Sequence, residues 1–303
     1  MQVRRVLTAL ASMAAVGACA IDERQQASDD LIRVADVGLR SPESVLHDPV
    51  ADVYLVSNIN GSSLRKDGNG FISRLAPDGS VLQLKWIDGA AAGVTLHAPK
   101  GLGLKGDTLL VADIDAVRLF DRKSGEAIGS WTVTGATFLN DIAVGPDGTV
   151  YVTDSGFRAG PGGFEPSGSD AVHRFDPSGE HAVLVSGTAL GGPNGILVDG
   201  NRVMFVTFGS GRVTLVQRED GTISGLPAPE AGQLDGVVKT AGGTFLMSSW
   251  EGGAVYRLGP GGLYTAEIAG LDAPADIGLD AVRGRLLIPL FRANEVLIAP
   301  LSE

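Results

Sequence analysis

The sequence predicts an all-β protein, a six-bladed β-propeller built from four-stranded antiparallel blades. Three observations lead to this fold class. The 43 glycines are spread evenly along the chain, as in a fold with many turns. A unit of two apolar strands joined by a turn recurs six times. The units follow one another at about 41 to 57 residues, close to the period of propeller blades.

Each repeat opens with an apolar strand, a turn rich in Gly, Asp or Asn, and a second apolar strand. The six copies read ESVLHDPVADVYLVSN, PKGLGLKGDTLLVADI, NDIAVGPDGTVYVTDS, PNGILVDGNRVMFVTF, LDGVVKTAGGTFLMSSW and PADIGLDAVRGRLLIPLF. After most copies a further strand pair surrounds a PDG, KSG, PSG or EDG turn, which are hairpin signals. Equivalent positions are marked by Glu43, Lys100, Asp141, Asn194, Asp235 and Asp276.

The last repeat ends in EVLIAPLSE and has no outer strand of its own. The segment LIRVADVGL, residues 31–39, is expected to supply that strand from the N-terminal side and to close the ring. Closure removes the exposed edges that an open sheet would present. The predicted propeller domain therefore spans residues 31–303.

The N-terminal segment predicts export. Residues 1–18 combine a basic start, an apolar run too short to span a bilayer and small residues at the end, which is typical of a signal peptide. The segment VGAC, ending at Cys19, resembles a bacterial lipobox, so Cys19 is the expected lipidation site. Residues 19–30 are expected to be a flexible tether. A plain secretory peptide is the alternative; a lipoprotein would face the periplasm from the outer membrane of a Gram-negative cell, or otherwise lie at the cell surface.

The charge balance, 35 acidic against 24 basic residues, argues against binding to nucleic acid or to anionic membranes. We therefore expect no contact with a membrane except through the lipid anchor. The expected partner is a small molecule, and the expected state is a monomer.

In a propeller, the start of each inner strand and the end of the next strand surround the same mouth of the central channel. The long insertions 59–70, 87–98 and 156–170 lie at that mouth, whereas the opposite mouth has tight turns. Elaborated loops on one face are where such scaffolds usually bind ligands.

Oxygen-bearing side chains gather at the starts of the inner strands. They are Glu43, Asn140, Asp141, Asn194, Asp235 and Asp276. Carboxylate and amide oxygens suit a hard divalent cation, above all Ca²⁺. Soft-metal sites are disfavoured, because Cys19 is the sole cysteine and the 4 histidines show no paired spacing. The alternative is that each residue merely caps a turn.

The motifs PESVLHD, FLNDIAV, GPNGILVD and QLDGVV, in this order on successive blades, resemble those of the regucalcin (senescence marker protein)/gluconolactonase family. The resemblance implies one divalent cation in the channel, most often Ca²⁺, with Zn²⁺, Mn²⁺ and Mg²⁺ as alternatives. Carried over motif by motif, its ligands are Glu43, Asn140, Asn194 and Asp235. The resemblance also implies hydrolysis of lactones or related esters, with the cation polarising the carbonyl.

In this family the aspartate of the DG motif, here Asp235, orients or deprotonates the attacking water. A carboxylate bound to a cation is a poorer base, so Asp235 is expected to act mainly by positioning the water. Asp141 is the alternative catalytic base, or else a residue that supports the ligands from behind.

The chain departs from the family at one position. Sugar lactonases of this family often carry an arginine two residues before the blade-three Asn, and here that position is Phe138. The expected pocket rim comprises Phe138, Asn58, Asp154, Trp250 and Phe291, beside Phe208, Asp113 and Ser249. Packing between blades is the alternative for the aromatic residues. If they line the pocket, a hydrophobic lactone or ester fits better than gluconolactone.

Two other functions remain open from the sequence. One is a non-catalytic propeller that binds a ligand or protein partner around a structural cation. The other is a related propeller enzyme of the strictosidine-synthase or streptogramin-lyase kind.

Overall fold

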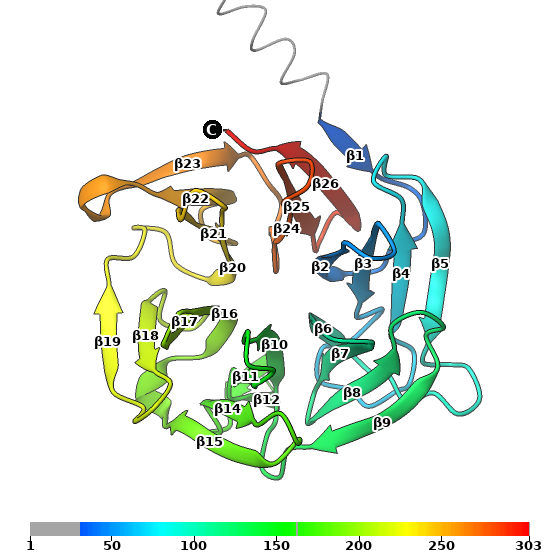
Figure 1. Cartoon of the computed structure of the whole chain (residues 1–303), viewed down its shortest axis with the longest axis horizontal. Helices are drawn as coiled ribbons and strands as arrows, with labels where there is room; N and C mark the ends of the chain where they lie inside the picture. The colour runs from blue at the N-terminus through cyan, green and yellow to red at the C-terminus, as the bar shows by residue number, and fades with distance from the viewer. Residues whose placement is uncertain (1–30, 162, 303) are drawn as a thin grey trace, which may run out of the picture.

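Six four-stranded antiparallel sheets surround a common axis in the computed structural model, which describes residues 31–161 and 163–302 (Figure 1). The prediction of an all-β, six-bladed propeller is confirmed. The innermost strands surround the centre of the ring, and the outermost strands form its perimeter. The predicted signal peptide, Cys19 and the tether lie outside the described residues.

The strands of the first three blades follow the chain from the centre outward. Blade one contains β2 (Pro42–Asp48), β3 (Val53–Asn58), β4 (Phe71–Leu75) and β5 (Val81–Asp88). Blade two contains β6 (Pro99–Lys105), β7 (Thr108–Asp113), β8 (Ala116–Asp121) and β9 (Ala127–Thr132). Blade three contains β10 (Leu139–Val144), β11 (Val150–Asp154), β14 (Ala171–Phe175) and β15 (His181–Ser186).

The remaining blades repeat this order. Blade four contains β16 (Pro193–Asp199), β17 (Arg202–Thr207), β18 (Val213–Gln217) and β19 (Ile223–Leu226). Blade five contains β20 (Leu234–Lys239), β21 (Phe245–Ser249), β22 (Ala254–Leu258) and β23 (Tyr264–Ala269). Blade six contains β24 (Gly278–Asp280), β25 (Arg285–Leu290) and β26 (Glu295–Pro300), and its outer strand is β1 (Ile32–Val34). The described chain also contains two short 3₁₀ turns, η1 (Thr188–Leu190) and η2 (Pro260–Gly262).

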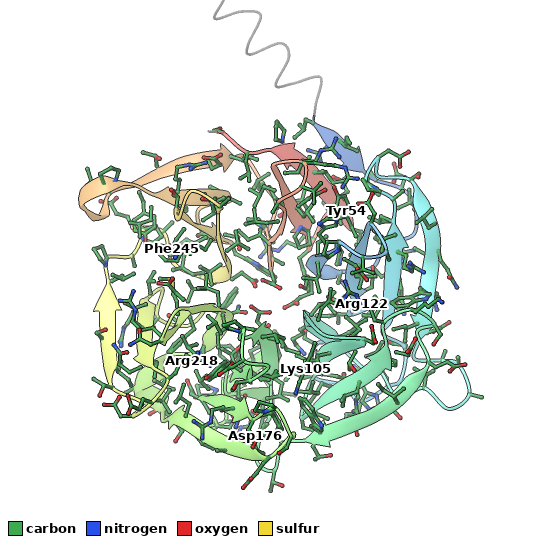
Figure 2. The ribbon with its side chains drawn as sticks, viewed as in Figure 1. Tyr54, Lys105, Arg122, Asp176, Arg218 and Phe245 are labelled. Carbon is green, nitrogen blue, oxygen red and sulfur yellow. The ribbon has the colours of Figure 1, made fainter. Side chains whose placement is uncertain are left out.

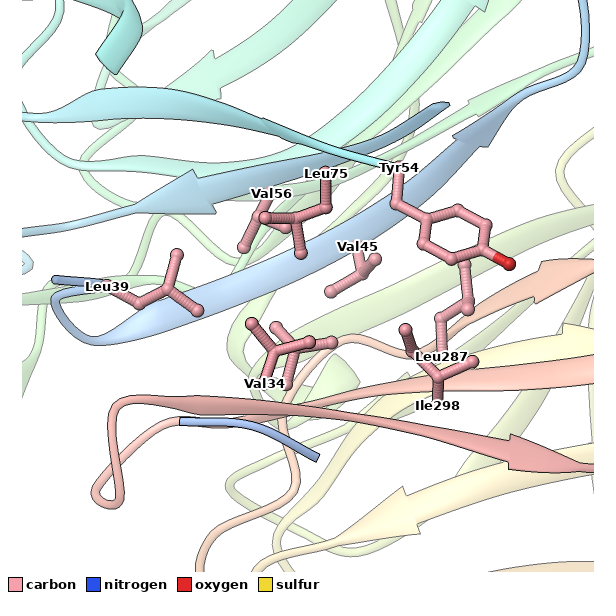
Figure 3. Close-up of a cluster of buried hydrophobic side chains, with 9 residues drawn as sticks. Val34, Leu39, Val45, Tyr54, Val56, Leu75, Leu287 and Ile298 are labelled. Atoms are coloured by element: carbon pink, nitrogen blue, oxygen red, sulfur yellow. The ribbon is translucent and has the colours of Figure 1, made fainter. Parts of the chain in front are cut away.

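The ring closes as the sequence predicts, because β1 pairs antiparallel with β26. A buried cluster between blades one and six secures this closure (Figure 3). Its members are Val34, Leu39, Val45, Tyr54, Val56, Leu75, Leu287, Val296 and Ile298. Burial of each such side chain contributes about 1.5–3 kcal/mol, so the closure rests on apolar packing as well as on strand pairing.

Ion pairs and hydrogen bonds link neighbouring blades at the mouth with tight turns. Arg122 Nε lies 2.8 Å from Asp48 Oδ2, and Arg218 Nε donates to the Tyr151 hydroxyl at 2.8 Å. Figure 2 labels Arg122 and Arg218 where adjacent blades meet. These side chains connect adjacent blades at this mouth. The long loops lie at the other mouth of the channel.

Five of the six inner strands carry a β-bulge at the end nearest that mouth. The strand register shifts between Pro42 and Val45, Pro99 and Leu102, Leu139 and Ile142, Pro193 and Ile196, and Leu234 and Val237. Each shift contains two residues, and a bulge of this kind redirects side chains locally. The first residues are Glu43, Lys100, Asn140, Asn194 and Asp235, and the second are Ser44, Gly101, Asp141, Gly195 and Gly236.

In blades two, four and five, glycine at the second bulge position is required by close contact with the next blade. A Cβ atom on Gly195 would lie 2.2 Å from the Asp235 carbonyl oxygen, and one on Gly236 would lie 2.4 Å from the Ile277 nitrogen. Neither contact is sterically possible without a backbone shift. The PNG and LDG motifs therefore combine one residue for the channel with one glycine for inter-blade packing.

The insertion at 156–170 is more ordered than a loop. It contains a separate hairpin, β12 (Phe157–Gly160) paired with β13 (Gly163–Pro166), which differs from the loop expected there. Both strands are only four residues long, which explains why no alternating pattern was evident. Within the described chain, no helix is long and apolar enough to cross a membrane.

Candidate cation and ligand site

The four side chains predicted as cation ligands lie together. Glu43, Asn140, Asn194 and Asp235 are buried and line one cavity of about 440 Å³ at the loop-bearing mouth. Each occupies the first bulge position of its inner strand, so the four come from blades one, three, four and five.

Each of these residues has one buried oxygen without a hydrogen-bond partner. The atoms are Glu43 Oε2, Asn140 Oδ1, Asn194 Oδ1 and Asp235 Oδ1. The Asn140 side chain is fixed by its other end, because its Nδ2 donates to Ser155 Oγ at 3.0 Å. Buried oxygens are normally hydrogen-bonded, and each exception calls for an explanation such as an ion. Two carboxylates and two amide oxygens are the donor set that a hard divalent cation prefers.

The electrostatics of the site also suit a cation. Burial raises the pKa of Glu43 well above its usual value, and the neighbouring carboxylates of Asp235 and Asp276 raise it further. Burial and Asp276 likewise raise the pKa of Asp235. A positive charge between them would oppose both effects. Among the described residues, no cluster of three or more His, Cys, Asp or Glu side chains has a metal-binding arrangement. This does not argue against the quartet as a cation site, because two of its four members are asparagines, which are not among those residue types.

The wall of the cavity is aromatic. Its lining residues include Phe138, Phe157, Phe164, Phe208, Trp250 and Phe291. Phe157 and Phe164 belong to the β12–β13 hairpin, and each ring meets Phe138 edge-on with ring centres 5.7 Å apart. Phe138, Trp250 and Phe291 therefore lie where the sequence predicts a pocket rim. The hairpin aromatics were missed, although FRAGPGGF in the sequence was a signal for them.

Two other predicted rim residues do not line the cavity. Asn58 and Asp154 are fully buried at the ends of second strands, so the prediction that they lie at the rim is wrong. Asn58 Oδ1 accepts a hydrogen bond from the Arg40 backbone at 2.9 Å. Asp154 accepts from the backbone nitrogens of Thr137 and Phe138 at 3.1 and 3.0 Å. The side chains of Asn58 and Asp154 therefore cap the segments that precede β2 and β10, the inner strands of their own blades.

The same capping role recurs at Asp113 and Ser249, which are also fully buried. Asp113 accepts from the backbone nitrogen of Ala98 at 2.8 Å, and Ser249 Oγ donates to the Gly232 carbonyl at 2.7 Å. The turn-capping alternative therefore applies to the second strands, whereas the first-strand residues face the cavity.

Asp141 lies on the other side of the quartet. Its carboxylate accepts from the backbone nitrogens of Ile142 and Ile196 at 2.6 and 2.7 Å, and it lines a separate cavity with Asp276. Asp276 accepts from Ser44 Oγ at 2.5 Å and its pKa is raised to about 7, mainly by burial. Asp141 is thus placed to support the strand that carries Asn194, which does not fit the prediction of a catalytic base in the cavity.

Lys100, which marks the second repeat in the sequence, also lines the cavity, and this role was not predicted. It is fully buried and occupies the blade-two bulge position beside the quartet. A buried lysine is rare. Its position in register with the four oxygen-bearing residues was the available signal.

A larger cavity, of about 650 Å³, lies between blades three and four at the opposite mouth. Arg218 pairs there with Asp147, and Asp176 and Asp220 accept hydrogen bonds within their own turns. The quartet cavity is therefore the candidate site.

The fold and this site define a class: six-bladed propellers with a ring of oxygen donors in the channel. The SMP-30/gluconolactonase/LRE-like region matches residues 72–275, more than half of the chain, and the protein belongs to this family. No curated protein matches the chain in sequence.

Several solved structures share the fold. A gluconolactonase from Xanthomonas campestris has a TM-score of 0.68 and 19% identity, over 90% of this chain and 89% of that one. A putative gluconolactonase has a TM-score of 0.69 and 18% identity, over 90% of this chain and 92% of its own. A virginiamycin B lyase from Staphylococcus aureus, in a catalytically inactive form with a histidine replaced by alanine, has a TM-score of 0.60 and 14% identity, over 90% and 99%. At these identities the likeness concerns the fold alone.

Proposed function

We propose that the protein is a divalent-cation-dependent hydrolase of apolar lactones or related esters. The observation that carries the proposal is the set of four unpaired buried oxygens at one end of an aromatic cavity. Glu43, Asn140, Asn194 and Asp235 would hold the cation, with Ca²⁺ as the first choice. A cation bound there supplies Lewis acidity toward a carbonyl oxygen.

The remaining residues account for the other requirements of ester hydrolysis. Asp235 orients the attacking water, and the aromatic wall binds the apolar part of the substrate and excludes bulk water. The water oxygen bonds to the acyl carbon, the bond from that carbon to the ring oxygen breaks, and a water proton passes to the departing alkoxide. The product is the open-chain hydroxy acid.

The aromatic wall favours an apolar substrate over a sugar lactone. A polyhydroxylated ligand needs several polar partners, because each buried hydroxyl without one is unfavourable by about 1–3 kcal/mol. Phe138 occupies the position of the sugar-binding arginine, and six aromatic rings line the cavity.

A lyase of the virginiamycin B type is less well supported. Replacement of a histidine inactivates the Staphylococcus aureus lyase. None of the 4 histidines of this chain lines the cavity.

The test is hydrolysis of a panel of aliphatic γ- and δ-lactones, aryl esters and aldonolactones, with Ca²⁺ and with a chelator. We expect cleavage of the apolar substrates, loss on chelation and recovery on addition of Ca²⁺. Asp235→Ala should lower kcat/KM by at least about 100-fold, and Asp67→Asn, an exposed acidic residue near the same mouth, should leave it unchanged. Failure of the Ca²⁺-loaded protein to cleave any substrate would refute the proposal and favour a non-catalytic ligand-binding propeller.

We further propose that the protein is exported, carries a lipid on Cys19 and acts as a monomer. The sequence of residues 1–30 supports the first two points. Light scattering of the soluble domain tests the third.

A further inference from the structure

Lys100 is a buried cation with unused hydrogen-bond donors. Its Nζ donates one hydrogen bond, to the Ala98 carbonyl at 3.0 Å, and lies 4.4 Å from the centre of the Phe138 ring. An ammonium group has three donors. No carboxylate of the described residues lies within 4.0 Å of Nζ. Two donors of a buried ammonium at the cavity wall therefore lack a protein acceptor.

The nearest acidic residues are engaged elsewhere. Burial lowers the pKa of Lys100, and the negative charges of Glu43, Asp113 and Asp154 oppose this effect in part. Asp113 pairs with Arg118 at 2.8 Å, and Asp154 accepts backbone hydrogen bonds. Glu43 belongs to the cation quartet. If a divalent cation offsets the charges of Glu43 and Asp235, the ammonium group is the uncompensated charge on the cavity wall.

The surroundings of Lys100 define the ligand that would fit it. One ammonium group offers a point charge, which suits a single carboxylate better than a dianion that needs several donors. The wall beyond it is aromatic, and the other polar lining residues outside the quartet are few, notably Ser63 and Gln233. A cavity of about 440 Å³ is large enough for a small organic ligand.

We propose that Lys100 binds a carboxylate group of an amphipathic ligand whose apolar part contacts the aromatic wall. The inference deepens the proposed function and rests on it, because ring opening of an apolar lactone creates such a carboxylate. Lys100 on blade two then supplies a positively charged side chain, whereas blade three carries Phe138 at the position where sugar lactonases often have an arginine. Its role is ligand binding and selection, and the proton transfers of hydrolysis do not require it.

The test is equilibrium binding, which does not depend on turnover. Octanoate and 1-octanol have equal chain length and differ in charge. Their binding is followed by the fluorescence of Trp250, which lines the cavity, and Trp250→Phe identifies its signal among the 3 tryptophans. Wild type, Lys100→Met and Lys100→Arg are compared in Ca²⁺ and in chelator. We expect Lys100→Met to weaken octanoate binding at least about 30-fold, to leave 1-octanol binding unchanged, and Lys100→Arg to retain most of the octanoate affinity.

Several results would overturn the inference. One is a wild type that does not bind octanoate, and another is equal binding of octanoate by Lys100→Met. A parallel loss of octanoate and 1-octanol would show that Lys100 supports the shape of the cavity only. If a chelator abolishes octanoate binding while Lys100→Met retains it, the carboxylate binds to the cation and Lys100 is not its partner. Lactone hydrolysis is assayed separately, so carboxylate binding without hydrolysis refutes the proposed function alone, and hydrolysis without Lys100-dependent binding refutes this inference alone.

Discussion

The unpaired oxygens of the quartet predict a large effect of cations on stability, and Asp235→Asn tests it. A buried acceptor without a partner costs about 1–3 kcal/mol. The four acceptors Glu43 Oε2, Asn140 Oδ1, Asn194 Oδ1 and Asp235 Oδ1 together would then cost roughly 4–12 kcal/mol. This is comparable with the whole free energy of unfolding of an ordinary domain.

Cation binding should recover part of that free energy. At a cation concentration about 100 times Kd the gain is about 2.7 kcal/mol, which corresponds to an increase in Tm of roughly 5–10 °C for a domain of this size. In Asp235→Asn the side chain keeps its shape but loses its charge. We expect the gain to shrink to below about 2 °C at the same cation concentration, whereas the cation-free variant should be as stable as the wild type or more so, because the repulsion from Asp276 is gone.

The assay is thermal unfolding followed by circular dichroism, with Ca²⁺, Mg²⁺, Mn²⁺ or Zn²⁺ or with a chelator. Asp67→Asn makes the same chemical change on the surface and should keep the full gain. The reasoning is refuted if no divalent cation raises the Tm of the wild type, or if Asp235→Asn keeps the wild-type gain.

Three further predictions follow from the site and the sequence. Burial raises the pKa of Glu43, and that of Asp276 to about 7, so these two carboxyl groups hold more protons in the folded cation-free protein than in the unfolded chain. Their contribution to stability falls as pH rises from about 4 to about 7, whereas the lowered pKa of His173 acts in the opposite direction. The Tm gain from Ca²⁺ should therefore grow over this range, as melts across pH would measure; a gain that shrinks with pH contradicts this. Phe138→Arg should raise the kcat/KM ratio of aldonolactone to apolar lactone by about tenfold or more, and an unchanged ratio would mean that this position does not select the substrate. Cys19→Ala should move the protein from the membrane fraction to the soluble fraction, with retention at the membrane as the opposing result.

The fold was predictable because its information is local and repeated. Alternating apolar strands and Gly-containing turns specify one blade, and six copies specify the ring. The closing strand was predictable as well, because the repeat that ends at Pro300 lacks one strand and the segment that contains Ile32 supplies it.

The site was only partly predictable, because the direction in which a side chain points at the end of a strand depends on local backbone geometry. The pattern of apolar and polar residues does not contain this geometry. Asp154 and Asn140 both flank apolar strands, yet Asp154 caps a loop and Asn140 faces the cavity. The difference arises from the bulge in the inner strand, which is visible only in the strand register. Lys100 was missed for a related reason, since a lysine at a strand end is usually exposed and only the ring geometry buries it.

The paired bulge residues separate two tasks that are often merged in a single side chain. The second residue of each pair meets the neighbouring blade, as Gly195 and Gly236 do, and it constrains the architecture. The side chain of the first residue lines the cavity, so its exchange leaves the backbone contact between blades in place. Five positions of this kind give the scaffold a route to new chemistries by single substitutions that leave the contacts between blades unchanged.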